Sequence, residues 1–424
     1  MRYYCLITIK KSTQDFIKNS FGNILEWYDF TIYGLFAIQI SEVFFPMHDR
    51  FISLLLVFFT FAIGFVARPI GAIIFGIIGD KKGKLYAVNL SIWLMAIPTT
   101  LIGLLPSYNQ IGLMAPICLV SLRILQGISA GGQFSGLLAI AADSNNKNRA
   151  FLVSLVHAIS IVGCLIASVV SYLSIIIVNS LDLSHAMTNF TWRIPFIISS
   201  ILFIIYIKFR PELSSHSFTY NKFSFMDILR KQPNELITMI IFGSCTGTVY
   251  YVLFSYIVTY LQLYVHLSKT TSFMIMNGIL LLSIILYPIF GYVAKNYLCR
   301  VAQAQKLILY LLVAAGIFTG AALSPWFAII GLVLMVIYFC AITAFVTSLF
   351  AEVFAINYRM TACSLSYNIG VTIAGFAPLI AEVFSSKLTN IGLPIFIGLV
   401  CMIMYVSLMR IRSSKGYQAV LSAT

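Results

Sequence analysis

Residues 51–79 read FISLLLVFFTFAIGFVARPIGAIIFGIIG, an apolar run in which Arg68 is the single charged residue. A helix rises about 1.5 Å per residue, so about 20 apolar residues cross the roughly 30 Å hydrocarbon core of a bilayer. This run is long enough to do so. It therefore predicts a membrane-spanning helix.

The rest of the chain has the same character. Of its 424 residues, 60% are hydrophobic and only 9% are charged, and the mean hydropathy is +0.96. A soluble domain carries about a quarter charged residues, so the composition predicts an all-α integral membrane protein. The net charge of +14 does not indicate a nucleic-acid partner, because the lysines and arginines lie scattered between the apolar runs.

Twelve apolar segments predict twelve transmembrane helices, at 21–45, 51–79, 85–105, 111–142, 150–178, 193–209, 235–265, 270–295, 306–323, 327–350, 361–384 and 391–409. The longest polar stretch, 210–234, separates six segments from six. We therefore expect an N-terminal six-helix bundle over 1–209, a cytoplasmic linker over 210–234 and a C-terminal six-helix bundle over 235–424. Such pseudo-symmetric halves are typical of transporters that bind their substrate in a central cavity.

Lysine and arginine orient the chain. If both termini are cytoplasmic, 21 of these residues lie on the inside and only Arg50, Arg193, Lys269 and Lys387 lie outside. Cytoplasmic loops carry such an excess of positive charge. We expect a multi-pass plasma-membrane protein with cytoplasmic N- and C-termini.

The first half carries four charged residues at membrane depth: Glu26, Asp29, Arg68 and Arg123. Charges at this depth are costly and usually face a cavity or a partner. Glu26 and Asp29 are three residues apart and share a helix face, with Tyr33 one turn further on. Two guanidiniums can bind an anionic or zwitterionic solute, and carboxylates in low-dielectric surroundings can load and release a proton near neutral pH. Two alternatives to a functional site stay open. The four residues form structural ion pairs, or Arg68 reaches the membrane interface.

The second half has no comparable charge at mid-depth, since Glu352 and Glu382 are expected near the membrane interfaces. It offers aromatic and polar side chains instead: Tyr250, Tyr251, Tyr256, Tyr260, Tyr367 and Asn368. Aromatic faces can hold an ammonium group by cation–π attraction. Ordinary packing of these tyrosines is the alternative.

Small residues recur in the second and fourth segments, at Gly64, Gly71, Gly76, Gly79, Gly127, Gly131, Gly132 and Gly136. This spacing lets helix backbones approach closely.

Gly127–Gly131 also fits the GxSxG pattern around Ser129, but that nucleophile elbow needs a strand–turn–helix context. An intramembrane serine protease with His157 or His266 as base is a remote alternative. Rings of like charge that would indicate a channel are absent, and the histidines and cysteines show no metal-ligand spacing.

Several stretches resemble the major facilitator superfamily and, within it, the metabolite:proton symporter family. They are FGNILEWYDF at 21–30, GFVARPIG at 64–71, RILQGISAGGQF at 123–134, WRIPF at 192–196, Tyr358-Arg359, Tyr367-Asn368-Ile369 and Ala377-Pro378. Gly76, Asp80, Gly83 and Lys84 resemble the superfamily's gating loop between the second and third helices. The resemblance covers nearly the whole chain.

The resemblance implies the major facilitator fold and proton-coupled uptake of a small organic solute by alternating access. It implies no cofactor beyond the proton gradient, a monomer in a bacterial inner membrane, and a substrate, protons and the lipid bilayer as partners. TGTVYY at 246–251 is most similar to the proline/betaine branch, which favours a zwitterionic osmolyte. A dicarboxylate or other organic acid symporter, or an uncoupled exchanger, is the alternative.

We expect neither an enzyme's catalytic residues nor a metal site. Proton coupling is expected at Asp29, which should pair with Arg123, and at Glu26. Substrate binding is expected at Arg123, Arg68, Tyr33, Gln133, Tyr250, Tyr251 and Asn368. The family usually has a glutamate where this chain has Gln133, which removes a titratable group there.

Overall fold

A computed structural model describes residues 21–82, 84–131, 149–180, 190–209, 232–294, 300–347, 349–354 and 359–414. All regular elements in these ranges are helices. The first half contains α2 (Phe21–Leu35), α3 (Ala37–Phe44), α4 (Arg50–Val66), α5 (Arg68–Lys82), α6 (Lys84–Leu104), α7 (Tyr108–Ile111), α8 (Met114–Ala130), α10 (Arg149–Ser180) and α12 (Arg193–Phe209). The second half contains α14 (Pro233–Tyr251), η1 (Val252–Tyr256), α15 (Ile257–Leu263), α16 (Lys269–Ala294), α17 (Arg300–Phe318), α18 (Pro325–Val346), α19 (Leu349–Glu352), α20 (Arg359–Ala374), α21 (Ala377–Leu388) and α22 (Gly392–Ser413).

Within these ranges, eight helical segments are long and apolar enough to cross a membrane. Three shorter apolar helices, at Leu90–Leu104, Met114–Ala130 and Arg193–Tyr206, match three further predicted spans. The pair α2 and α3 matches the first span, so the prediction of twelve membrane-spanning helices is confirmed. The fifth predicted span, 150–178, coincides with the apolar segment Ala150–Val178.

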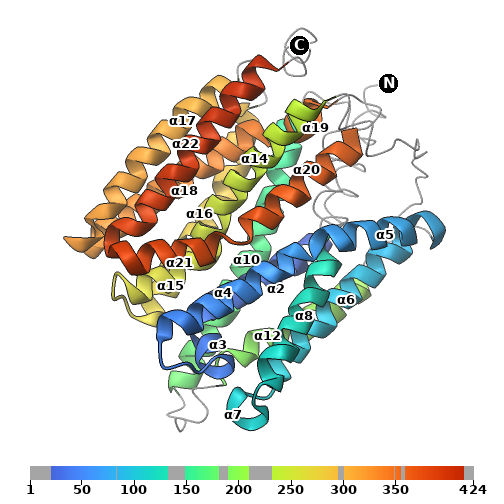
Figure 1. The fold of residues 1–424 in the computed structure, drawn as a ribbon, viewed down its shortest axis with the longest axis vertical. Helices are drawn as coiled ribbons and strands as arrows, with labels where there is room; N and C mark the ends of the chain where they lie inside the picture. The colour runs from blue at the N-terminus through green and yellow to red at the C-terminus, as the bar shows by residue number, and fades with distance from the viewer. Residues whose placement is uncertain are drawn as a thin grey trace.

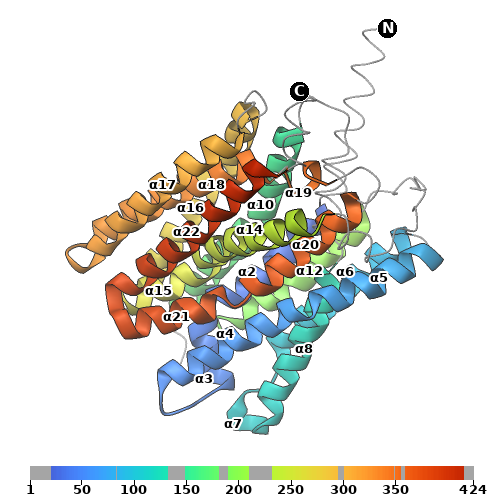
Figure 2. The same cartoon turned by 45° about the horizontal axis from the view of Figure 1, so that its top comes forward.

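The helices form two groups (Figure 1). Those coloured from yellow-green to red, α14 to α22, gather on one side, whereas the blue and cyan helices α4, α5, α6 and α8 lie on the other. Figure 2 shows the same separation after rotation. The predicted linker at 210–234 lies almost entirely outside the described residues.

Glycines bring α4 and α5 against α8, as the small-residue pattern predicts. A Cβ atom on Gly127 would lie 1.8 Å from the Gly64 carbonyl oxygen, and one on Gly71 would lie 1.8 Å from the Ile128 carbonyl oxygen. No side chain fits at such a separation. The contact fixes α8, which carries Arg123, against α4 and against α5, which begins at Arg68.

We expect Gly127→Ala to lower the thermal midpoint of the purified protein in detergent by several degrees. The added methyl group clashes with backbone, and overpacking of this kind costs about 1–3 kcal/mol. The matched control is Gly278→Ala in α16, where an added Cβ meets no atom within 4 Å. A Gly127→Ala midpoint equal to that of the control would contradict this packing.

The main contacts between the two halves, among the described helices, are of three kinds. The helix α10 packs along α16 and also meets α18, α2 meets η1, and α4 meets α20 and α21 while α5 meets α20. At the second contact a Cβ on Gly34 would lie 2.9 Å from Ser255 Cβ. At the third, the Thr372 hydroxyl donates a hydrogen bond of 3.0 Å to the Phe65 carbonyl. The membrane-depth charges of the first half therefore lie within a closely packed interior.

Candidate functional site

Glu26 and Arg68 form a buried ion pair between α2 and α5. The Glu26 Oε1 atom accepts from Arg68 Nη2, and both side chains are 1% exposed. Arg68 Nη2 also lies 3.3 Å from the Ala130 carbonyl oxygen. The Arg68 side chain is therefore held inside the protein by Glu26 and does not extend out of it, which contradicts the alternative in which it reaches the membrane interface.

Asp29 and Arg123 belong to one hydrogen-bonded chain. Thr99 of α6 donates to Asp29 Oδ2 at 2.8 Å, and Gln126 Nε2 lies 2.5 Å from the Thr99 hydroxyl. Arg123 Nη1 then donates to Gln126 Oε1 at 2.9 Å. Among the described residues no direct ion pair joins Asp29 to Arg123, because Thr99 and Gln126 stand between them. The expected direct pair is therefore replaced by a relay of two neutral side chains.

The two arginines keep unused hydrogen-bond donors. Nε and Nη2 of Arg123, and Nε and Nη1 of Arg68, are buried without a hydrogen-bond partner among the described residues. Arg123 lies over the Tyr33 ring, 3.5 Å from its centroid, and Arg68 lies over Phe65 at 5.5 Å. A buried donor without a partner costs about 1–3 kcal/mol, more when charged. These nitrogens are suited to an anionic group such as a carboxylate.

Aromatic rings join the halves beside the arginines. We call Trp27, Phe61, Phe65, Tyr250 and Tyr251 the aromatic seam. Trp27 lies 4.7 Å from Tyr250 and 6.3 Å from Tyr251, between ring centroids. Tyr251 in turn lies 4.8 Å from Phe65 and 5.9 Å from Phe61. All five side chains are buried, so a solute reaches these faces only when the rings separate.

Of the other predicted site residues, Asn368 lies on α20, which packs against α4 and α5, and the rest are not fully described. Asn368 is buried in α20, where its carbonyl accepts from Thr372. Gln133 and Gly83 lie outside the described residues, and Gly76, Asp80 and Lys84 have described backbone only. The predicted gating loop therefore stays a prediction.

Glu382, expected near the outer end of the eleventh span, lies on α21 among tyrosine hydroxyls. Its side chain is 2% exposed, and it accepts from the hydroxyls of Tyr256 and Tyr264 at 2.8 and 2.9 Å. Tyr256 also touches the first half through Phe58, with ring centroids 5.5 Å apart. Tyr256, Tyr260 and Tyr264 recur every four residues and so share one helix face. This spacing is the sequence signal that could have indicated a buried polar partner.

Ser129 has a packing role in this structure. Its hydroxyl donates to the Ser91 carbonyl at 2.5 Å and so joins α8 to α6. His157, one of the two histidines considered as its base, stacks on Tyr287 of α16 with centroids 5.2 Å apart. The geometry assigns the GxSxG match to helix packing.

Twelve membrane-spanning segments in two groups, with buried charges beside an aromatic interface, are typical of a membrane transporter. The model of the Major Facilitator Superfamily matches residues 19–359, and the chain belongs to this family. It is a transporter and not an enzyme, as the sequence predicts.

The relatives carry transporter names. The chain is 30% identical over 398 residues to the proline/betaine transporter of Escherichia coli (strain K12), covering 89% of this chain and 78% of that protein. It is 27% identical to the glycine betaine/proline/ectoine/pipecolic acid transporter OusA of Dickeya dadantii (strain 3937), covering 88% and 78%. The predicted similarity to the proline/betaine branch is confirmed.

A solved structure supports the fold. A crystal structure of a D-xylose-proton symporter superposes with a TM-score of 0.74 at 14% identity, covering 93% of this chain and 96% of the other. At this identity the likeness establishes the fold alone.

Proposed function

We propose that this protein takes up a small zwitterionic solute of the proline or betaine kind together with protons, by alternating access. Both termini are cytoplasmic in this proposal, as the distribution of lysine and arginine favours. The observation that carries it is the pair of buried arginines with unused donors, of which Arg68 lies over Phe65 of the aromatic seam at 5.5 Å and Arg123 over Phe61 at 6.0 Å.

A zwitterion needs two kinds of contact, and the buried arginines and the aromatic seam could supply both. Its carboxylate can bind a guanidinium in bidentate geometry. Its ammonium can rest on tryptophan and tyrosine faces, which attract cations through the ring quadrupole. Trp27 and Tyr250 supply such faces across the line where the halves meet. A substrate bound there would contact both halves. Its binding would therefore favour one position of the two halves relative to each other.

Glu26 and Asp29 are the proposed proton carriers. Asp29 is connected to Arg123 through Thr99 and Gln126, so protonation of Asp29 would alter the hydrogen bonds that orient this arginine. Protonation of Glu26 would release Arg68 from its ion pair. A proton on Glu26 would thus free a guanidinium for the substrate carboxylate, and a proton on Asp29 would act on the orientation of the other guanidinium.

A dicarboxylate is the second candidate substrate. Two arginines with unused donors could bind two carboxylates. Such a substrate would make no use of the cation-attracting faces of the seam. The aromatic side chains therefore discriminate between the two candidates.

The test is exchange of labelled proline, glycine betaine and dicarboxylates in proteoliposomes, comparing the wild type with Trp27→Leu and Trp27→Phe. We expect Trp27→Leu to raise the KM for betaine roughly 2- to 30-fold, the range that corresponds to a cation–π contribution of about 0.5–2 kcal/mol. Trp27→Phe should restore part of the affinity.

The control is Trp326→Leu, because Trp326 is 70% exposed in the first turn of α18. A wild type that exchanges dicarboxylates but neither proline nor betaine would overturn the proposed substrate class. An unchanged KM for betaine in the Trp27→Leu variant would also overturn it.

A further inference from the structure

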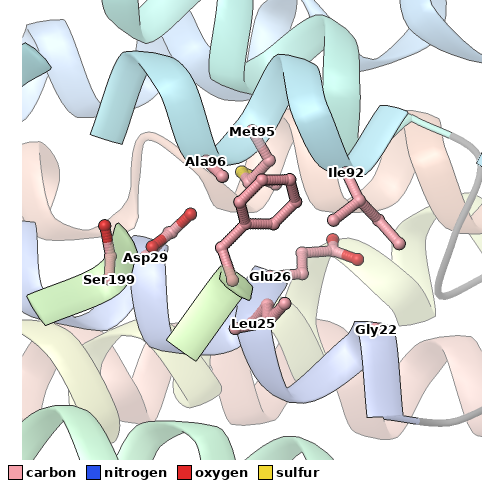
Figure 3. Close-up of a pocket in the computed structure, with 9 residues that line it drawn as sticks. Gly22, Leu25, Glu26, Asp29, Ile92, Met95, Ala96 and Ser199 are labelled. Atoms are coloured by element: carbon pink, nitrogen blue, oxygen red, sulfur yellow. The ribbon is translucent and has the colours of Figure 1, made fainter. Parts of the chain in front are cut away.

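Glu382 is a buried carboxylate that the proposed proton coupling does not use. The proposed proton carriers Glu26 and Asp29 lie together on α2 (Figure 3), whereas Glu382 lies on α21 of the second half and is 2% exposed. A charge at membrane depth is costly unless other groups pair or hydrogen-bond with it. Its two hydroxyl partners, Tyr256 and Tyr264, therefore indicate what Glu382 does in the protein.

The two tyrosines stand at either end of α15, within an irregular part of the seventh span. Tyr256 is the last residue of the π-helical turn η1, after which the Ile257 amide donates to the Val252 carbonyl. Tyr264 directly follows the last residue of α15. Such π-helical turns are rare and occur frequently at functional sites. Because each Glu382 oxygen accepts from one of the hydroxyls, the carboxylate joins both ends of α15 to α21.

The segment held in this way is also a part of the second half that contacts the first. The Tyr256 ring packs on Phe58 of α4, with centroids 5.5 Å apart. A Cβ on Gly34 of α2 would lie 2.9 Å from Ser255 Cβ, so the backbones of α2 and η1 approach closely. The helix α21 itself also packs against α4. The hydrogen bonds to Glu382 therefore hold η1 in the position in which the halves meet.

This contact lies at the end of the molecule that is expected to face outward. Figure 1 shows α3, α15 and α21 toward the same end. Three of the four basic residues expected outside mark this end, because Arg50 begins α4, Lys269 begins α16 and Lys387 lies in the last turn of α21. Phe36 adds a second contact between the halves, 5.9 Å from Phe273 between ring centroids. The structure is therefore closed at its expected outer end.

We propose that Glu382 is a positioning residue that keeps the outer end of the transporter closed. By accepting from Tyr256 and Tyr264, it holds η1 on α21, with the Tyr256 ring against Phe58. Loss of these bonds lets η1 move away from α2 and α4, and the outward-open state becomes more populated. This inference rests on the proposed alternating access and adds the residue that holds one of its two closed ends.

The test measures which end of the protein opens. Ser255→Cys places a thiol in η1 at the outer contact. Ser154→Cys places one in α10 at the expected cytoplasmic end, where a Cβ on Gly291 of α16 would lie 2.5 Å from Ser154 Cβ. Both serines are buried. An impermeant maleimide labels the first thiol in right-side-out vesicles and the second in inside-out vesicles, each counted above the labelling of the chain without the added cysteine.

We expect Glu382→Leu to raise the labelling rate of Ser255→Cys at least about tenfold, the change that loss of one hydrogen bond to a charged group makes in an equilibrium. The labelling rate of Ser154→Cys should not rise, because only the outer end is released. Glu382→Gln should stay within about twofold of the parent, since its amide oxygen accepts from one hydroxyl and its amide nitrogen donates to the other. Tyr264→Phe, which removes a single hydroxyl, should produce part of the rise.

The control is Lys387→Leu, which removes an exposed charge from the last turn of the same helix and should match the parent at both thiols. Faster labelling of both thiols in Glu382→Leu would indicate general loosening and overturn the proposal. An unchanged rate at Ser255→Cys, or equal rates for Glu382→Gln and Glu382→Leu, would overturn it as well. The labelling needs neither substrate nor a proton gradient, so its outcome is separate from the transport assays that test the proposed function.

Discussion

Asp29→Asn should abolish proton-driven accumulation of substrate while leaving its exchange down a gradient. Asparagine retains an oxygen that can accept from Thr99, which now donates at 2.8 Å, so the local hydrogen bonds survive. It cannot take up and release a proton, and Gln133 cannot substitute for it. Uptake into proteoliposomes under an imposed pH gradient, and exchange without one, measure the two quantities separately.

The control for this variant is Asp49→Asn. Asp49 is exposed and caps α4 by accepting from the Phe51 amide at 2.8 Å, so its loss should leave coupling intact. Glu26→Gln should impair coupling less than Asp29→Asn, although it also breaks a buried ion pair and should lower stability. Protonophore-sensitive accumulation by Asp29→Asn would show that the Asp29 network is structural.

Arg123→Gln should reduce kcat/KM for uptake at least about 30-fold. Removal of one partner from a buried charge-assisted hydrogen bond costs about 2–5 kcal/mol. The loss should fall on proline, betaine and dicarboxylates alike, because each presents a carboxylate. Initial rates of exchange over a range of substrate concentrations give kcat/KM directly.

Arg123→Lys separates charge from shape. Lysine keeps the positive charge but lacks the planar fork of donors, so it should recover only part of the activity. Arg410→Gln, on the exposed last turn of α22, should behave as the wild type. An Arg123→Gln protein with unchanged kcat/KM would remove this arginine from the substrate site.

The spans were predictable because their apolar length is a property of the chain itself. The breaks within them were not. The second span turns at Ala67, and the seventh contains the π-helical turn η1 at Val252–Tyr256. The latter packs on α2 at Gly34. Such irregularities depend on contacts with other helices, which no single span encodes.

The candidate site was predictable in part for a related reason. A charge at membrane depth is conspicuous, so Glu26, Asp29, Arg68 and Arg123 could be selected from the sequence. Their partners could not, since the rotation of each helix decides which side chains meet. Thr99 and Gln126 are neutral, and each is unremarkable within its own helix. Only the packing of α8 on α6, and of α6 on α2, brings them between Asp29 and Arg123.

Accumulation of labelled proline or betaine in proteoliposomes tests the central claim most directly. With an inward proton gradient, we predict internal substrate well above the external concentration, and collapse of that excess when a protonophore is added. Empty liposomes provide the baseline. Equilibration without accumulation, or accumulation that persists with the protonophore, would contradict proton-coupled uptake by this protein.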